Sequence, residues 1–240
     1  MKKSDKNLKK MLESIPENFD IMQDGIDIET LKEYSGYSHS FDKGKLSDKE
    51  TINLGRALIE KKLPIEARKK ILVLLAHLGT IEACRQIENY CNSPDNDLKH
   101  WSLLSLQECR MFLEGSIMDE SMGYIASGLG GLGNRMRYYF FVLPLIGASF
   151  TQIQKDVIKS EFETICNVLN SIVENINFSD IYVGFTVLVP VDVAVGTLID
   201  SGIKRCNELG EFVFEHYYVG NVNIPDQKEI LEIIEIIMKD

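Results

Sequence analysis

The residues most able to do chemistry gather between 127 and 137. Four glycines fall within six positions and two arginines follow them: Gly128, Gly130, Gly131 and Gly133, then Arg135 and Arg137. Glycine-rich backbone can turn its N–H groups inward to form a concave anion site, and the planar guanidinium of arginine can bind two oxygens at once. One hypothesis is therefore a site for an anion or small ligand made by Gly130, Gly131, Gly133, Arg135 and Arg137.

The position of this segment argues against a nucleotide-binding loop of either common kind. Those loops follow a strand and open a helix, whereas this segment precedes the strand predicted at 135–145. The lysine and the following hydroxyl of a phosphate-binding loop are both missing. A flexible turn between two domains is the favoured interpretation, and the two arginines are what keep the anion hypothesis open.

Other reactive side chains are dispersed along the chain. The four histidines are His39, His77, His100 and His216, and no HExxH, GxSxG or paired-histidine spacing occurs. His216 follows Glu215 in a predicted strand, where neighbouring side chains point to opposite faces and form no dyad. The sequence therefore predicts no catalytic residue, no metal and no cofactor. Whether the chain is an enzyme stays open, with a non-enzyme favoured.

Composition narrows the class of protein. The chain has 240 residues, 45% hydrophobic and 26% charged, with a net charge of −10. No apolar run reaches the roughly eighteen residues that span a bilayer, and the negative balance argues against a broad phosphate-binding surface. The five cysteines have no CxxC spacing and are expected to be reduced. These features predict a cytoplasmic protein with neither membrane nor nucleic acid as a partner.

Helical patterns dominate the first half. Residues 1–46 have poor periodicity and are predicted to be irregular or to form short helices. Ser47 and Glu50 form a capping box, and helices are predicted at 47–63, 64–78, 80–91 and 95–114. Trp101 lies on the apolar stripe of the last of these, so we expect it to be buried.

The second and fourth of these helices align at an offset of 31 residues. Leu72 falls on Leu103, Val73 on Leu104 and Leu75 on Leu106, and amphipathic pairs repeated in this way must stack to bury their apolar faces. Over residues 47–115 the pattern resembles the shorter HEAT-like repeats of phycobilisome lyases. It lacks their recurring Asp-Pro turn and valine–arginine pairing, and a generic four-helix stack is the alternative. The resemblance implies a surface for a protein partner.

Strands and helices alternate in the second half. Strands are predicted at 135–145, 180–189 and 211–219, with helices at 151–175, at 193–209 and from Pro225 onward. Helical crossovers favour parallel pairing of neighbouring strands. The predicted architecture is a three-stranded, layered α/β domain of the order β-α-β-α-β-α.

Alternation within these strands predicts a face that is less apolar than the other. Its members are Tyr139, Tyr182, Thr186, Glu215 and Tyr217, together with Arg137. If all the helices lay on the opposite face, this one would be bare and could bind a partner. The alternative is that the N-terminal helices cover it.

Taken together, the sequence predicts an α+β chain in three segments: 1–46 irregular, 47–126 a HEAT-like helical stack, and 127–240 an α/β domain. The favoured function is a cytoplasmic, non-enzymatic scaffold that binds a protein partner or itself. Two alternatives stay open: a regulator that binds a small ligand or anion at the glycine-rich segment, and an enzyme with a site between the domains.

Overall fold

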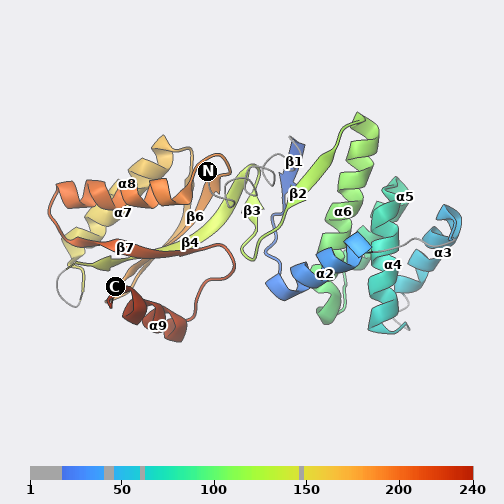
Figure 1. Cartoon of the computed structure of the whole chain (residues 1–240), viewed down its shortest axis with the longest axis horizontal. Coiled ribbons are helices and arrows are strands. Elements are labelled where there is room, and N and C mark those ends of the chain that lie inside the picture. Colours follow the sequence, from blue (N-terminus) through green and yellow to red (C-terminus); the bar gives the residue numbers. More distant parts are fainter. Residues whose placement is uncertain (1–17, 41–45, 60–62, 146–148, 240) are drawn as a thin grey trace, which may run out of the picture. The chain divides into compact units, whose positions relative to one another are not determined.

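The computed structural model describes residues 18–40, 46–59, 63–145 and 149–239 (Figure 1). The chain divides into two compact units. The helical unit comprises the described residues up to Met22 together with Ile26–Ala126, and the α/β unit comprises Gln23–Gly25 with the described residues from Ser127 onward.

Most of the helical unit consists of consecutive helices. They are α2 (Ile28–Ser40), α3 (Asp48–Ile59), α4 (Ile65–Leu78), α5 (Ile81–Cys91), the short 3₁₀ helix η1 (Asn96–Leu98) and α6 (Lys99–Met118). Local signals set several of their ends. Ser47 Oγ accepts from the backbone N–H of Glu50, whose carboxylate accepts from the N–H of Ser47. Gly79 ends α4 in the left-handed region, with φ of 55°, and Thr80 caps α5.

A two-stranded parallel sheet joins the beginning and the end of the helical unit. Strand β1 (Asn18–Ile21) pairs with β2 (Met122–Ile125), and the backbone N–H of Met22 continues the ladder to the carbonyl of Ile125. The sequence predicted irregular structure or short helices for 1–46; it did not predict the strand, and α2, with thirteen residues, is a longer helix than expected. Such a short strand is stabilised by a partner about a hundred residues away, so its own residues carry little signal.

Trp101 lies at the centre of the helical core, as predicted from its apolar stripe. Its side chain is 1% exposed, and its indole N–H donates to the carbonyl of Lys69 at 3.3 Å. The rings of Tyr34 and Tyr37 meet it edge-on at 5.0 and 5.7 Å. Helix α2, which supplies both tyrosines, is therefore part of the core.

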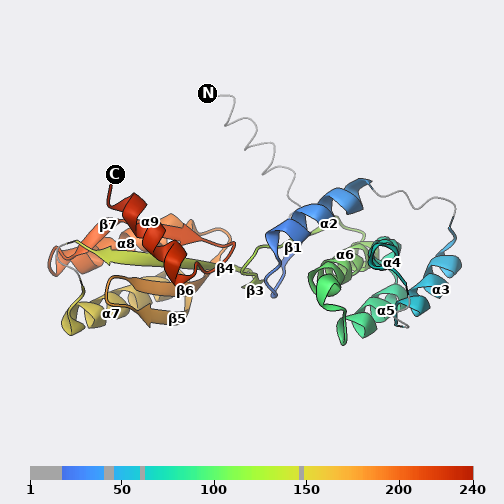
Figure 2. The ribbon, with the colours of Figure 1, turned by 90° about the horizontal axis from the view of Figure 1, so that it is seen from below.

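The α/β unit contains one curled antiparallel sheet with helices on both sides (Figures 1 and 2). Its elements are β3 (Gly131–Leu132), β4 (Arg135–Pro144), α7 (Gln152–Val168), β5 (Ile172–Phe178), β6 (Val183–Pro190), α8 (Val195–Glu208), β7 (Val213–Gly220) and α9 (Gln227–Ile237). Across the sheet the order is β7–β4–β6–β5, and the short β3 pairs with the first residues of β4. Every pairing is antiparallel.

The predicted three-stranded parallel domain is therefore wrong, although the mixed α+β class is confirmed. The error begins at 151–175, which was assigned to one helix. Helix α7 ends at Val168, and Asn170 reverses the chain with a φ of 52° before β5 begins at Ile172. Strand β5 then forms a hairpin with β6, so the order becomes β-α-β-β-α-β and neighbouring strands run in opposite directions.

Helices cover both faces of this sheet. Helices α7 and α8 lie on one face, where Phe140, Phe162 and Phe185 form an aromatic cluster with ring centroids 4.7 to 5.5 Å apart. Helix α9 lies on the other, hereafter the α9 face, where Ile230 packs against Tyr139, Phe141 and Tyr182 (Figure 2). The less apolar face is thus neither bare nor in need of cover from the N-terminal helices, because the last helix of the same unit packs against it.

Candidate functional site

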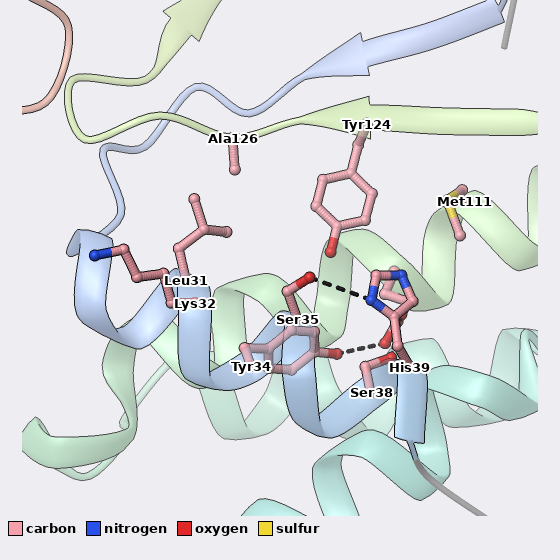
Figure 3. Close-up of a pocket in the computed structure, with 10 residues that line it drawn as sticks. Leu31, Lys32, Tyr34, Ser35, Ser38, His39, Met111, Tyr124 and Ala126 are labelled. Carbon is pink, nitrogen blue, oxygen red and sulfur yellow. Dashed lines mark hydrogen bonds between the residues drawn. The ribbon is translucent and has the colours of Figure 1, made fainter. Parts of the chain in front are cut away.

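A pocket of about 650 Å³ opens on the helical unit (Figure 3). We call it the Glu108 pocket. Helix α2 supplies most of its wall, α6 supplies Glu108 and Met111, and the strand end after α6 supplies Tyr124 and Ala126. The α2 residues are Leu31, Lys32, Tyr34, Ser35, Ser38 and His39. Three- and four-residue steps along α2 put Leu31, Tyr34 or Ser35, and Ser38 on one helix face, which explains why a single helix can line so much of the pocket.

Glu108 is a carboxylate with little access to solvent. Its side chain is 10% exposed. The hydroxyl of Tyr34 donates to its Oε2 at 2.5 Å, and the hydroxyl of Ser38 donates to its Oε1 at 2.6 Å. His77, in the last turn of α4, places its Nε2 3.6 Å from Oε2. Buried charges need partners of this kind, and here they come from two helices other than α6.

The directions of these hydrogen bonds do not fit a serine activated by a histidine. Ser38 Oγ lies 2.8 Å from Nε2 of His77. Because the Ser38 hydroxyl donates its proton to Glu108, it can only accept at the other contact, so His77 carries its proton on Nε2. A histidine that donates to serine cannot take the serine's proton. In this arrangement the cluster holds the negative charge of Glu108.

Electrostatics keep the Glu108 carboxyl ionised. Burial acts to raise its pKa, but the hydrogen bonds from His77, Ser38 and Tyr34 outweigh burial, and the pKa is lowered from its ordinary value of 4.5. The phenols around it shift in the opposite direction. Burial, followed by the charge of Glu108, raises the pKa of Tyr34 and of Tyr124 well above the usual range. At neutral pH the pocket therefore combines one negative charge with neutral hydroxyl groups.

The mouth of the pocket is polar. Figure 3 shows Tyr124 reaching from its strand toward Ser35 and His39, while Lys32 extends away from them. Ser35 Oγ lies 3.3 Å from Nδ1 of His39, and the Lys32 ammonium pairs with Glu29 at 2.8 Å. The Lys32 ammonium is therefore paired on the outer surface, and Glu108 supplies the charge inside the pocket.

In the structure, the arginines of the predicted anion site bind to other residues of the chain. Gly131 lies in β3, and Gly130 and Gly133 have positive φ in the turns on either side of it. Arg135 donates to the backbone and side-chain oxygens of Asn170 at 2.8 Å. Arg137 pairs with Glu174 at 2.5 and 2.9 Å and also donates to the carbonyl of Leu129. Both guanidinium groups bond within the chain, so we do not propose an anion site here.

The predicted interaction surface divides between the two faces of the sheet. Tyr139, Tyr182 and Thr186 lie together on the α9 face, where they line a second pocket. Tyr217 packs with the core on the other face, beside α8, and Glu215, two residues earlier on β7, lies on the same face as Tyr217. The strand register explains the division. Tyr139 lies opposite Gly220 on β7. Glu215 is an odd number of residues from Gly220, so its side chain points to the other face of the sheet.

Sequence reasoning missed the Glu108 pocket. In the sequence, Glu108 and Arg110 lie on either side of Cys109 and suggest a surface ion pair, but in the structure Arg110 pairs with Glu88 at 2.8 Å. A signal was present, because Glu108 continues the stripe of Trp101 and Leu104 at helical spacing and so falls on the buried side of α6. The hydroxyl donors had no such signal, since α2 was not recognised as part of the core.

Among the described residues, no group of three or more His, Cys, Asp and Glu side chains is placed to hold a metal ion. In the same part of the chain, no helix combines the length and apolar character needed to cross a bilayer.

Comparisons with known proteins give similarities of structure only. No protein-family model matches the sequence, and a search of curated proteins finds no match. Among solved structures, the chain is similar to a "putative transposase" from Deinococcus radiodurans R1, with 12% identity and a TM-score of 0.37, over 42% of this chain and 90% of that one. It is also similar to the REP-associated tyrosine transposase bound to a REP hairpin, with 9% identity and a TM-score of 0.33, over 42% of this chain and 64% of that one.

These similarities contradict three of the predictions from sequence. Both solved structures are described as transposases. This description conflicts with three predictions: that the chain is a non-enzymatic protein-binding scaffold, that HEAT-like repeats define it, and that nucleic acid is excluded as a partner. We do not retain those predictions. TM-scores below 0.5 transfer no function to this chain, so the proposals below are argued from its own residues.

Proposed function

We propose that the chain binds a small organic cation, and that the Glu108 pocket holds the ligand's ammonium group. The observation that supports this proposal is the ionised, largely buried carboxylate among the residues that line a pocket of about 650 Å³. That volume suits a small molecule. A fixed negative charge held largely out of solvent selects for positive charge, because its attraction is screened much less than on an open surface.

The carboxylate keeps capacity for one more donor. Each carboxylate oxygen can accept about two hydrogen bonds. The hydroxyl of Tyr34 and the ring of His77 approach Oε2, and within the described part of the chain the hydrogen bond to Oε1 comes from Ser38. An ammonium N–H can therefore be accommodated at Oε1 without displacing an internal donor.

The other lining residues favour a ligand with an apolar body. Leu31, Met111 and Ala126 supply aliphatic surface, and Tyr124 supplies an aromatic ring and a hydroxyl. Tyrosine rings also attract cations through their π faces. The ligand class that fits is an amine with a short hydrocarbon or aromatic portion.

Binding can be tested with three compounds that share one ring and differ in charge. Tyramine carries an ammonium group, 4-ethylphenol is neutral, and 4-hydroxyphenylacetate carries a carboxylate. We expect calorimetry to show tyramine binding more tightly than 4-ethylphenol, with no binding of the acid. Butylamine and butanol repeat the comparison without the ring.

Glu108→Gln removes the charge and preserves the side-chain shape. Hydrogen bonds to charged groups contribute about 1.5–3 kcal/mol, so this variant should weaken amine binding between about tenfold and a hundredfold. Glu88→Gln is the matched control, because it removes a carboxylate from the surface pair with Arg110 and leaves the pocket intact. Tyr124→Phe, which keeps the ring, provides a second pocket variant in case Glu108→Gln lowers the folded fraction. Equal affinities for the amine and its neutral analogue would contradict the proposal.

A further inference from the structure

Two thiols meet where α5 packs against α6. Cys84 on α5 and Cys109 on α6 both lie in the core of the helical unit, and both are free. They are 25 positions apart in the sequence, yet their Sγ atoms lie 2.6 Å apart. A disulfide bond is about 2.05 Å long, so the two sulfur atoms need to approach each other by only about half an ångström to form one. Helix packing thus brings the pair within reach of a covalent bond.

A second contact shows that this pairing is set by the way the two helices pack. Cys91 lies seven residues after Cys84 on α5. It hydrogen-bonds with Ser102, which lies seven residues before Cys109 on α6. Equal steps in opposite directions mean that the helices run antiparallel and keep one register over two turns. Along this interface Cys84 faces a thiol, whereas Cys91 faces a hydroxyl and has no disulfide partner there.

The two thiols differ in access to solvent and in acidity. The side chain of Cys84 is 5% exposed and that of Cys109 is 0% exposed. Burial raises the pKa of both, while the hydrogen bond between them lowers the pKa of Cys84 and raises that of Cys109 further. Since the thiolate is the form that reacts with oxidants, Cys84 is the first of the two to react.

We infer that Cys84 and Cys109 are a redox-sensitive pair, which a peroxide converts into a reversible disulfide that stabilises the helical unit. The Cys84 sulfur attacks one oxygen of hydrogen peroxide, the O–O bond breaks, and Cys84 becomes a sulfenic acid as water leaves. The Cys109 sulfur then attacks the Cys84 sulfur, the S–O bond breaks and a second water leaves. In total the two thiols lose two electrons and two protons, and one peroxide is reduced to two waters.

The bond would close a loop of 25 residues that contains the end of α5, η1 and the beginning of α6. A cross-link of this kind stabilises a protein mainly by constraining its unfolded chain. It would also join α5 to the helix that carries Trp101, so the fluorescence of that residue reports the change. The inference does not rest on the ligand proposed for the Glu108 pocket.

A peptide map of the full-length chain tests the pair directly. The reduced protein is incubated with hydrogen peroxide, its remaining thiols are blocked with iodoacetamide in denaturant, and it is digested without reduction. Trypsin puts the three cysteines of the helical unit on separate peptides: Cys84 on 71–85, Cys91 on 86–99 and Cys109 on 100–110. We expect peptides 71–85 and 100–110 to be linked, and dithiothreitol to separate them.

Thermal denaturation gives the second measurement. We expect the oxidised protein to melt several degrees above the reduced protein when Trp101 fluorescence is followed. Treatment with dithiothreitol should remove the difference, because the link is reversible.

Two variants separate the pair from the other thiol at the interface. Cys91→Ser should still form the link in full. Cys109→Ser should form no link and should show no rise in Tm on oxidation. Its sulfenic acid at Cys84 then has no neighbouring thiol and should be oxidised further to sulfinic acid. Serine suits this interface, since Ser102 is itself fully buried there, and the map of the wild type does not depend on either variant.

Three results would overturn the inference. The first is that peroxide oxidises Cys91 fully while Cys84 and Cys109 stay unlinked in the wild type. The second is that the link is no more abundant in the folded protein than after oxidation in denaturant, where the five cysteines pair by chance. The third is that the linked protein melts no higher than the reduced one.

Discussion

Glu108 shows how the surroundings of one residue decide its role. A glutamate two residues from an arginine in a helix is ordinary on a surface. Here α6 turns it inward, and Tyr34, Ser38 and His77 supply the donors that keep it ionised. The same three donors make it a structural group and a candidate ligand-binding group at once.

The lowered pKa of Glu108 makes the stability of the helical unit pH-dependent. A carboxyl whose pKa is lower in the folded state contributes stability that is present above its unfolded value and is lost as pH falls through the folded value. We expect Glu108→Gln to melt below the wild type at neutral pH, and the difference in Tm to shrink as pH falls below 4.5. Thermal denaturation followed by Trp101 fluorescence measures this. A difference that stays constant down to strongly acidic pH would contradict it.

The buried cysteines form a second residue-scale feature. Cys84 on α5 and Cys109 on α6 are free thiols in the core, and their Sγ atoms lie 2.6 Å apart. Burial raises the pKa of both, so the reactive thiolate is scarce.

We expect iodoacetamide at mildly alkaline pH to modify the half-buried Cys91 before Cys84 or Cys109 in the folded protein. Burial raises the pKa of Cys91 as well, so access is the difference that this experiment detects. Peptide mass spectrometry at increasing times gives the order of labelling. In denaturant all three should react at similar rates, which serves as the control. Labelling of Cys109 as fast as Cys91 in the folded state would show that the core opens readily.

At the scale of elements, the packing of α7 against α8 depends on one glycine. A Cβ atom at Gly202 would lie 2.5 Å from the ring of Phe162. That ring is fully buried between Phe140 and Phe185, so it has little freedom to move.

Gly202→Ala tests which of two effects is larger. Alanine favours a helix over glycine by about 1 kcal/mol, but overpacking a buried site costs about 1–3 kcal/mol. We expect overpacking to dominate, with the free energy of unfolding lowered by about 1–2 kcal/mol. Gly196→Ala in the same helix is the control, because its Cβ would approach only the Tyr217 hydroxyl, at 3.4 Å. Chemical denaturation of both variants measures the change in the free energy of unfolding. A Gly202→Ala variant more stable than the wild type would show that the Phe162 ring can shift.

At the scale of the whole molecule, buried residues form separate clusters in the two units. One cluster contains only residues of the helical unit, and the other two contain only residues of the α/β unit. Each unit thus has a core of its own, as expected of a domain.

Two probes can follow these cores separately. Trp101 is the sole tryptophan, so its fluorescence reports on the helical unit, while far-UV circular dichroism reports on both. We expect Gly202→Ala to lower the melting temperature of the α/β unit, which circular dichroism detects. The melting temperature reported by Trp101 fluorescence should stay unchanged. Equal shifts in both signals would show that the units unfold as one.

The sequence by itself determined the elements with strong local signals. The helices predicted at 64–78 and 80–91 are confirmed by α4 and α5, where a proline, a threonine cap and a glycine stop mark the ends. The strands predicted at 135–145, 180–189 and 211–219 are confirmed by β4, β6 and β7. Burial of Trp101 also followed from its stripe. In each case the information lies within one or two turns of helix or a few residues of strand.

Only the tertiary structure decided the rest. Strands β1 and β2 pair across about a hundred residues, and β5 has isoleucine and valine that fit a helix stripe equally well until β6 pairs with it. Because that hairpin was missed, the sheet direction was predicted wrongly. The Glu108 pocket and the cysteine pair depend on such contacts: Glu108 meets donors from α2 and α4, and Cys84 meets Cys109 where α5 packs against α6. Contacts between residues far apart in sequence leave no periodic pattern in the chain, so only the folded arrangement shows them.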